Sequence, residues 1–218
     1  MSYANPYSKL SQNEYPATPY LLFTRLAMMI SLTTPTLTFE DYLAYDDGTD
    51  NHYELIHGHL ELMNPPRVEH FLIAKFLEQQ LDTEIQRLSL PWLTFREAGV
   101  RTGFNKSRLT DLCVVTQEQA KELLGQAAVF QTAPLLIVEV VSPDSIARDY
   151  RYKRSEYAAL AVPEYWIVDP LEAKVTVLQW EEGWYEELIL TGNQAIASPT
   201  LPELTLTIDR ILAAGTIR

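Results

Sequence analysis

The chain has 218 residues, of which 47% are hydrophobic and 21% are charged, as expected for one globular domain with a substantial core. Its formal net charge of -12 excludes a protein that coats nucleic acid non-specifically, although it leaves room for a local basic cleft. The lone cysteine, Cys113, excludes an internal disulfide framework and a multi-cysteine zinc site, and it predicts a reducing, cytoplasmic setting.

Residues 1–35 are expected to form an N-terminal extension, because the first clear structural signal begins only after them. Their apolar stretch, residues 20–32, is too short to span a membrane and is interrupted by a charge. It also lacks the charge placement and cleavage site of a signal peptide. We therefore expect no membrane association, a true start at Met28 or Met29, and a domain over residues 36–218.

Helices and strands are predicted from periodicity and from turn residues. Apolar residues at spacings of three and four, or a capping residue before acids, predict helices. These are expected at residues 38–43, 70–88, 117–124 and 149–160. Short apolar or alternating runs bounded by turn residues predict strands. These are expected at residues 53–56, 59–63, 92–95, 99–101, 109–115, 135–141 and 165–169.

The C-terminal part of the chain predicts an antiparallel hairpin. Residues 174–180 and 184–190 read as its two strands, and the segment between them ends in Gly183. Residues 102–108 are expected to be a polar loop. The order of elements predicts a single α/β domain with a mixed central sheet flanked by helices and followed by this hairpin.

Two apolar runs each carry a carboxylate where only hydrocarbon is expected. Glu139 lies within residues 135–143, and Asp111 lies near the start of residues 109–115. An unpaired buried charge is costly, so Glu139 requires a partner. If the two strands are neighbours, roughly 4.8 Å apart, both carboxylates converge on one hard cation. The alternative is a pair of structural acids capped by main-chain amides or by an arginine.

Lys153 falls in the middle of the apolar arc of the predicted helix that follows Glu139. A lysine at this position points toward the sheet, where Glu139 offers a negative partner. The alternative is a lysine that snorkels to the edge of the core or pairs with Glu156.

Two carboxylates and one ammonium group suit phosphodiester cleavage by a metal-bound water. Asp111, Glu139 and the main-chain carbonyl of Val140 would hold Mg²⁺ or Mn²⁺. Lys153 would orient the water or neutralise charge that develops on the phosphate. The sequence therefore predicts a metal-dependent hydrolase.

Five segments resemble the Uma-two family, a bacterial group of restriction-endonuclease-like proteins in the PD-(D/E)XK nuclease superfamily. They are residues 53–58, 111–115, 139–143, 153–157 and 162–170. The resemblance covers roughly Leu37 to Leu212, and Val162-Pro163-Glu164-Tyr165-Trp166 is its most specific mark. It implies a restriction-endonuclease-like fold, a magnesium-type metal and DNA as the substrate.

The resemblance also implies roles for individual residues. Asp111 matches the acid of the first half-motif, and Glu139 matches the acid of the second. Val141 stands where the superfamily has its lysine, so the ammonium would come from Lys153. Family members tend to show Arg-Pro before the aspartate, whereas this chain has Leu109-Thr110.

Several other polar side chains have two interpretations. Glu54 resembles the auxiliary catalytic acid that many members of the superfamily bring from an early element, and the alternative is an exposed strand carboxylate. His70 is expected to be a core histidine or a helix-start residue rather than part of the site. His57 and His59 flank a turn and are too isolated for a zinc site.

Basic residues flank both motifs, where the phosphate backbone of DNA would pass. The candidate DNA-binding residues are Arg101, Lys106, Arg108, Arg148 and Arg151. Such a patch would offset the negative net charge locally and would give salt-dependent affinity. The alternative is ordinary solvated surface charge.

These observations predict a metal-dependent endonuclease that cleaves DNA, with Asp111, Glu139, Lys153 and Glu54 as its site. A second hypothesis is a catalytically silent nuclease fold that binds DNA or a protein partner. A third is a hydrolase that uses Ser142 and Lys153, although it leaves both acids unexplained. The resemblance is also compatible with a homodimer.

Overall fold

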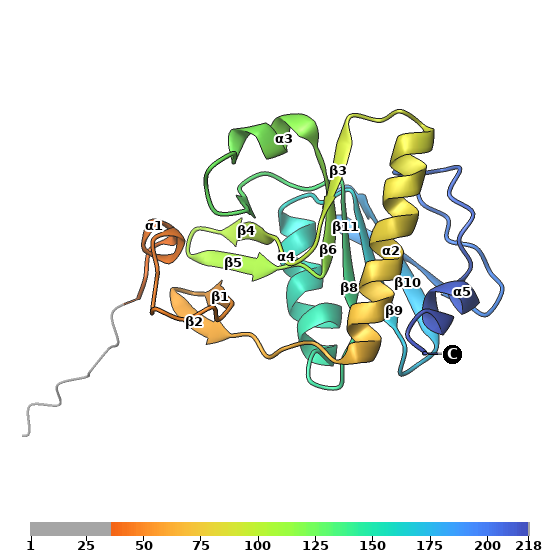
Figure 1. Ribbon diagram of the computed structural model, residues 1–218, viewed down its shortest axis with the longest axis horizontal. Coiled ribbons are helices and arrows are strands. Elements are labelled where there is room, and N and C mark those ends of the chain that lie inside the picture. Colours follow the sequence, from red (N-terminus) through yellow and green to blue (C-terminus); the bar gives the residue numbers. More distant parts are fainter. Residues whose placement is uncertain (1–35, 218) are drawn as a thin grey trace, which may run out of the picture. The chain divides into compact units, whose positions relative to one another are not determined.

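The computed structural model describes residues 36–217 (Figure 1). The predicted N-terminal extension, residues 1–35, lies outside the described residues. The helices are α1 Phe39–Leu43, α2 Val68–Arg87, α3 Gln117–Glu122, η1 Arg148–Lys153, α4 Arg154–Ala159 and α5 Ile208–Ala213. The strands are β1 Tyr53–Ile56, β2 His59–Leu62, β3 Trp92–Phe95, β4 Gly99–Gly103, β5 Lys106–Leu109, β6 Leu112–Thr116, β7 Val129–Phe130, β8 Leu136–Val140, β9 Glu164–Asp169, β10 Lys174–Glu181 and β11 Trp184–Thr191. In this part of the chain, no helix combines the length and apolar character that crossing a membrane requires.

The larger sheet of the described residues has the strand order β11-β10-β9-β8-β6-β3. β8 and β9 run parallel, whereas the other neighbouring strands are antiparallel. This confirms the predicted mixed sheet, and β10 and β11 form the predicted hairpin. All five residues of β8 are buried, as expected of an apolar run in the middle of a sheet that is covered on both faces.

A smaller sheet, with the order β2-β1-β5-β4-β7, accompanies the larger one (Figure 1). Its β4 and β5 form a hairpin across residues 102–108, so the prediction of a polar loop there was wrong. The reason is that polar residues in this segment have partners inside the protein. Ser107 and Arg108 are buried, and the guanidinium of Arg108 is neutralised by Glu54 and Glu156.

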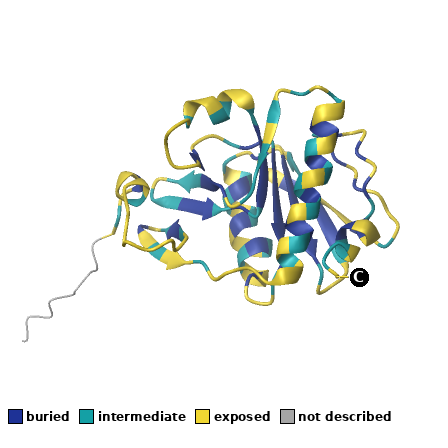
Figure 2. Cartoon of the chain, viewed as in Figure 1, coloured by how far each residue is buried: buried dark blue, intermediate teal, exposed yellow. Residues whose placement is uncertain are grey.

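Helix α2 covers one face of the larger sheet, as its apolar spacing predicted. Its buried side chains join those of β6, β8 and β9 in one core cluster, and Figure 2 shows them facing the buried strands. The inward side chains are Ile73, Ala74, Leu77, Leu81 and Ile85. A second core cluster includes Tyr157 of α4, whose ring packs edge-on against Tyr165 of β9. The larger sheet is thus covered by α2 and by α4.

Replacing Leu81 with alanine is expected to lower the free energy of unfolding by about 2–5 kcal/mol. The side chain is fully buried between α2 and the sheet, so its loss leaves a cavity that the fold cannot close completely. Urea unfolding measures the change. Leu124→Ala is the matched control, because Leu124 is 77% exposed, and we expect it to change stability by less than about 0.5 kcal/mol. Equal losses in the two variants would contradict this packing.

The helix predicted over residues 149–160 is present, but it begins with a wider turn. Arg148–Lys153 form the π-helix η1, and Arg154–Ala159 continue as the α-helix α4. π-Helical turns are rare in proteins, and those that occur often lie at functional sites. Asp149 and Lys153 are the buried residues of η1. Hydrophobic periodicity places the helix correctly but does not reveal this local widening.

Candidate active site

Two acidic side chains meet on neighbouring strands of the larger sheet. Asp111 immediately precedes β6, Glu139 belongs to β8, and these strands pair with Leu112 opposite Val138. The main-chain N–H of Val140 donates a hydrogen bond to Asp111 Oδ2 at 2.6 Å. Because the N–H and C=O of one strand residue point to the same edge, the Val140 carbonyl faces the Asp111 side as well. The structure therefore brings Asp111, Glu139 and Val140 together.

Lys153 reaches the two acids from η1. Its Nζ lies 2.8 Å from Glu139 Oε2 and donates a hydrogen bond to the Leu109 carbonyl at 2.7 Å. Glu54 Oε1 and Asp149 Oδ1 lie farther away, at 3.6 and 4.0 Å from Nζ. Only 3% of the Lys153 side chain is exposed, so it does not snorkel to the surface. Its ammonium is held inside a group of carboxylates.

Glu54 is fully buried in β1 and is not an exposed strand carboxylate. It accepts hydrogen bonds from the Arg108 guanidinium at 2.8 Å and from the Leu109 N–H at 3.1 Å. Arg108 also donates two hydrogen bonds to Glu156, at 2.7 and 2.8 Å. Glu54 therefore anchors the end of β5 and lies 3.6 Å from the Lys153 ammonium. This geometry suits a positioning residue rather than a group that touches the substrate.

Two further side chains fix the orientation of the acids. His70, the third residue of α2, places Nε2 3.0 Å from Asp111 Oδ1. The hydroxyl of Tyr157 donates a hydrogen bond to Glu139 Oε1 at 2.9 Å. The sequence predicted His70 as a core or helix-start residue rather than part of the site; it does lie at the start of α2, but it contacts Asp111. Its contact with Asp111 depends on how α2 packs, which periodicity does not specify.

Asp149 is a functional candidate that sequence reasoning missed. It is buried in η1, accepts a hydrogen bond from the Ser145 hydroxyl, and lies near Lys153. The signal available in the sequence was the spacing of four residues between Asp149 and Lys153. An acid four residues before an inward-facing lysine occupies the same face of the helix.

The surroundings shift the pKa values of the two strand-borne acids in opposite directions. For Asp111, burial raises the pKa, but the hydrogen bond and charge of His70 and the charge of Lys153 outweigh burial and lower it. For Glu139, burial raises the pKa well above its usual value; Lys153 opposes this rise, and the charges of Asp111 and Asp149 reinforce it. A bound cation would favour the charged form of Glu139.

A pocket of about 460 Å³ opens onto these side chains. Exposure falls steeply from its rim to its floor. Phe71 at the rim is 43% exposed, and the side chains of Asp111 and Glu139 are 23% and 2% exposed. Asp149 and Lys153 also lie at the floor. The acids and the ammonium therefore line the inner part of the pocket.

Residues 39–209 match the model of the Uma2 family, which carries the description "Putative restriction endonuclease". The chain belongs to the Uma2 family. The matched residues include both acids and the lysine described above, and the resemblance to the Uma-two family is confirmed. Among curated proteins, no sequence matches this Uma2 chain.

Solved structures similar to this Uma2 chain include a nuclease and a restriction enzyme. The first is "a putative nuclease belonging to DUF820" from Anabaena variabilis ATCC 29413, with a TM-score of 0.70 and 19% sequence identity. The match covers 83% of this chain and 99% of that one, and it confirms the predicted restriction-endonuclease-like fold. The second is the type IIG restriction endonuclease BpuSI, matched at a TM-score of 0.37 and 13% identity over 70% of this chain and 17% of its own. The second likeness is too low to bear on fold or function.

The basic residues do not gather into the surface patch that the sequence of this Uma2 member predicted. Arg108 is buried and paired with two carboxylates, so it is not available to phosphate. Lys106 lies 3.5 Å from Glu156, and Arg101 stacks over the ring of Phe39 at 4.0 Å. Of the other two candidate arginines, Arg148 lines the pocket. Arg151 is exposed to solvent and does not line the pocket.

The donor set of this Uma2 site suits a hard divalent cation. Asp111, Glu139 and the Val140 carbonyl offer oxygen, the ligand type of Mg²⁺, which keeps several water ligands. Within residues 36–217, no three His, Cys, Asp or Glu side chains form a metal cage. The arrangement therefore suits an ion that is held partly by main chain and water.

The charged side chains that line the pocket of this Uma2 protein also suit a divalent cation. Among the described residues, the lining contains six carboxylates, four lysine or arginine side chains and two histidines. These are Asp50, Glu97, Asp111, Glu139, Asp144 and Asp149, then Arg67, Arg96, Arg148 and Lys153, and finally His52 and His70. The carboxylates in the lining outnumber the lysine and arginine side chains by two. A divalent cation would offset part of this excess.

Proposed function

We propose that this Uma2 member is a metal-dependent endonuclease that hydrolyses DNA phosphodiester bonds. The observation that carries the proposal is the meeting of Asp111, Glu139 and Lys153 at the floor of one pocket. Phosphodiester hydrolysis needs oxygen ligands for a cation and a positive charge near the phosphate, and these residues offer both. Membership of a family described as restriction endonucleases supports DNA as the substrate.

Asp111, Glu139 and the Val140 carbonyl would hold Mg²⁺ or Mn²⁺. When bound, such an ion polarises the phosphate and lowers the pKa of a water molecule. The hydrogen bonds from Val140 N–H and from His70 fix the Asp111 carboxylate, and the Tyr157 hydroxyl fixes that of Glu139. Each acid is thus held in one orientation before a substrate enters.

Lys153 supplies the ammonium in place of Val141, the residue at the usual lysine position of the superfamily. Burial lowers the pKa of Lys153, but the surrounding carboxylates, with Glu139 first, outweigh burial and raise it above the ordinary value. The side chain therefore stays charged. Glu54 and Asp149 hold it close to Glu139, where it can orient the attacking water or neutralise charge on the phosphate.

The test is cleavage of supercoiled plasmid by the full chain in the presence of Mg²⁺ or Mn²⁺. Wild-type protein is expected to produce nicked or linear DNA. Asp111→Ala and Glu139→Ala protein, prepared identically and checked for folding by circular dichroism, is expected to produce none. Cleavage by the wild type at the level of these variants would contradict the proposed activity.

A catalytically silent nuclease fold is the second candidate, favoured by Val141 and by Leu109-Thr110 in place of Arg-Pro. The position of Lys153 weakens it, because the missing ammonium is present 2.8 Å from Glu139. Calorimetry with Mn²⁺ separates the two functions, since a silent descendant need not bind the ion. The Ser142 hydrolase is weakened as well, because Lys153 is engaged by Glu139 and Leu109.

His70→Ala is expected to weaken Mn²⁺ binding by about 10- to 100-fold, the usual cost of removing a side chain that orients a metal ligand. The reason is the 3.0 Å contact of His70 with Asp111. Isothermal titration calorimetry measures the affinity. His59→Ala removes an exposed histidine of β2 and is expected to change nothing. Unchanged affinity in both variants would show that His70 does not position the acid.

The setting of the protein is also part of the proposal. The free Cys113 is buried in β6 as a small core side chain, and a chain with a single cysteine suits a reducing compartment. We therefore place the protein in the cytoplasm. A homodimer, which would bring two sites to two DNA strands, stays a prediction that size-exclusion chromatography with light scattering can check.

A further inference from the structure

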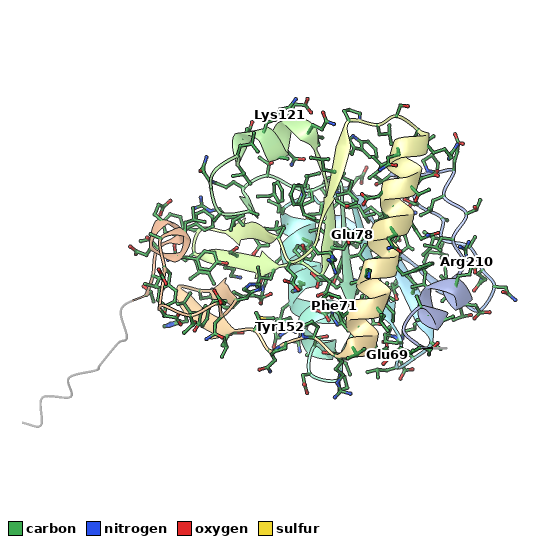
Figure 3. All side chains as sticks on the ribbon, viewed as in Figure 1. Glu69, Phe71, Glu78, Lys121, Tyr152 and Arg210 are labelled. Atoms are coloured by element: carbon green, nitrogen blue, oxygen red, sulfur yellow. The ribbon has the colours of Figure 1, made fainter. Side chains whose placement is uncertain are left out.

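The rim of the pocket carries a flat, partly exposed surface next to the acids. Phe71 follows His70 in the first turns of α2, so one turn of helix contributes both a rim aromatic and the contact to Asp111. The guanidinium of Arg96 lies over the Phe71 ring, 5.0 Å from its centroid. Glu78, which projects from the same side of α2 as Phe71 (Figure 3), holds Arg96 at 3.0 Å. Phe71 and Arg96 together form a rim platform.

A platform of this kind matches the faces of nucleic-acid bases. Unpaired bases stack on aromatic rings and on arginine guanidinium planes, whereas bases inside a duplex are already stacked on each other. The ion pair with Glu78 and the contact with the Phe71 ring keep the guanidinium at the rim, where a base can stack on it. The platform would therefore bind a base that has left its stack.

Arg148 offers a phosphate contact on the same pocket. Its side chain is 31% exposed and lines the pocket, and its Nε lies 3.9 Å from Asp149. Within residues 36–217, no acceptor forms a hydrogen bond with this buried Nε. A partly exposed arginine in a pocket wall is suited to a phosphate oxygen.

The depth of the floor limits what can reach it. Glu139, Asp149 and Lys153 are each 2–3% exposed, so a reacting phosphate must enter the pocket rather than lie across its mouth. A duplex holds its phosphates on a stiff cylinder, but an unpaired nucleotide can swing out and carry its phosphate inward. A volume of about 460 Å³ falls in the range of pockets that enclose one small molecule.

We infer that the pocket receives a single unpaired nucleotide, with its base on the rim platform of Phe71 and Arg96 and its phosphate between Arg148 and the floor. The substrate class is thus a nucleic-acid strand that is unpaired at the cleaved position, such as a single strand or a flap. This inference rests on the proposed nuclease function. It states that the site selects its substrate by whether the nucleotide at the cleaved position is unpaired.

The experiment compares three fluorescein-labelled DNAs of one sequence: a single strand, a blunt perfect duplex, and a duplex with an unpaired flap. Cleavage is followed with Mg²⁺, and binding is followed by anisotropy with Ca²⁺ in its place. We expect the single strand and the flap to be cut at least about 10-fold faster than the duplex and to bind more tightly. Equal or faster cutting of the blunt duplex would overturn the inference.

Variants at the rim test the platform itself. Base stacking contributes about 1–3 kcal/mol, so Phe71→Ala is expected to weaken single-strand binding by about 5- to 150-fold, and Phe71→Tyr is expected to keep it. Trp184→Ala is the matched control, because Trp184 is an exposed aromatic on the edge strand β11. Equal binding by Phe71→Ala and Trp184→Ala would refute the platform. Absence of cleavage on all three DNAs would instead refute the nuclease function, and the binding comparison would still decide the inference.

Discussion

Replacing Glu139 with glutamine is expected to slow DNA cleavage by at least about 10³-fold while the fold is retained. Glutamine keeps the size of the side chain and can still accept the hydrogen bond from Tyr157. It removes the charge that would hold the cation and that pairs with Lys153 at 2.8 Å. Single-turnover cleavage of a labelled strand with Mg²⁺ measures the rate, and urea unfolding shows that the variant is folded.

The matched control is Glu164→Gln. Glu164 is also a fully buried strand glutamate, at the start of β9 next to β8. It accepts hydrogen bonds from Trp166, Ser198 and the main chain of Thr200, and it does not line the pocket. We expect Glu164→Gln to lower stability but to leave the single-turnover rate of the folded protein within about 3-fold of wild type. Equal rates for the two variants would remove Glu139 from the site.

Replacing Lys153 with methionine is expected to lower the free energy of unfolding by about 3–5 kcal/mol and to abolish cleavage. Removing one partner of a buried ion pair leaves an uncompensated charge, which is the costly case. Here three carboxylates lose their shared cation, namely Glu139, Glu54 and Asp149. Urea unfolding at neutral pH gives the stability, and the single-turnover assay gives the rate.

Two companion variants separate the buried charge from general effects of losing a lysine. Lys121→Met removes a solvent-exposed lysine of α3 (Figure 3) and is expected to change stability by less than about 0.5 kcal/mol. The double variant Lys153→Met with Glu139→Gln is expected to recover part of the stability and none of the activity, because one unpaired charge is gone. A Lys153→Met protein as stable as Lys121→Met would contradict the buried cluster.

The floor of the site was predictable because charge inside an apolar run is unusual. Glu139 interrupts a buried strand, Asp111 immediately precedes one, and Lys153 interrupts the apolar face of a helix. A charge at such a position needs a partner in the same place, so the three residues could be grouped without coordinates. Hydrophobic periodicity and turn residues predicted the order of the elements and the mixed sheet.

The same pattern does not distinguish a site from a structural contact. Glu164 also lies in a buried strand, and besides the nearby Trp166 its partners are Ser198 and Thr200, which lie more than thirty residues further along the chain. Arg108 likewise looked like a surface charge beside Asp111, and its partner Glu54 lies fifty-four residues away. Partners at these separations are set by the pairing of distant strands (Glu54 in β1, Arg108 in β5) and by the packing of a C-terminal loop against β9, which periodicity does not report.

The most direct test of the metal site is the crystal structure of the wild-type protein grown with Mn²⁺ and analysed by anomalous diffraction. We predict one Mn²⁺ peak in contact with the carboxylates of Asp111 and Glu139 and with the Val140 carbonyl. A crystal grown at a saturating Mn²⁺ concentration that shows no anomalous peak in this pocket, with Lys153 still paired to Glu139, would contradict the assignment of these acids to a divalent cation.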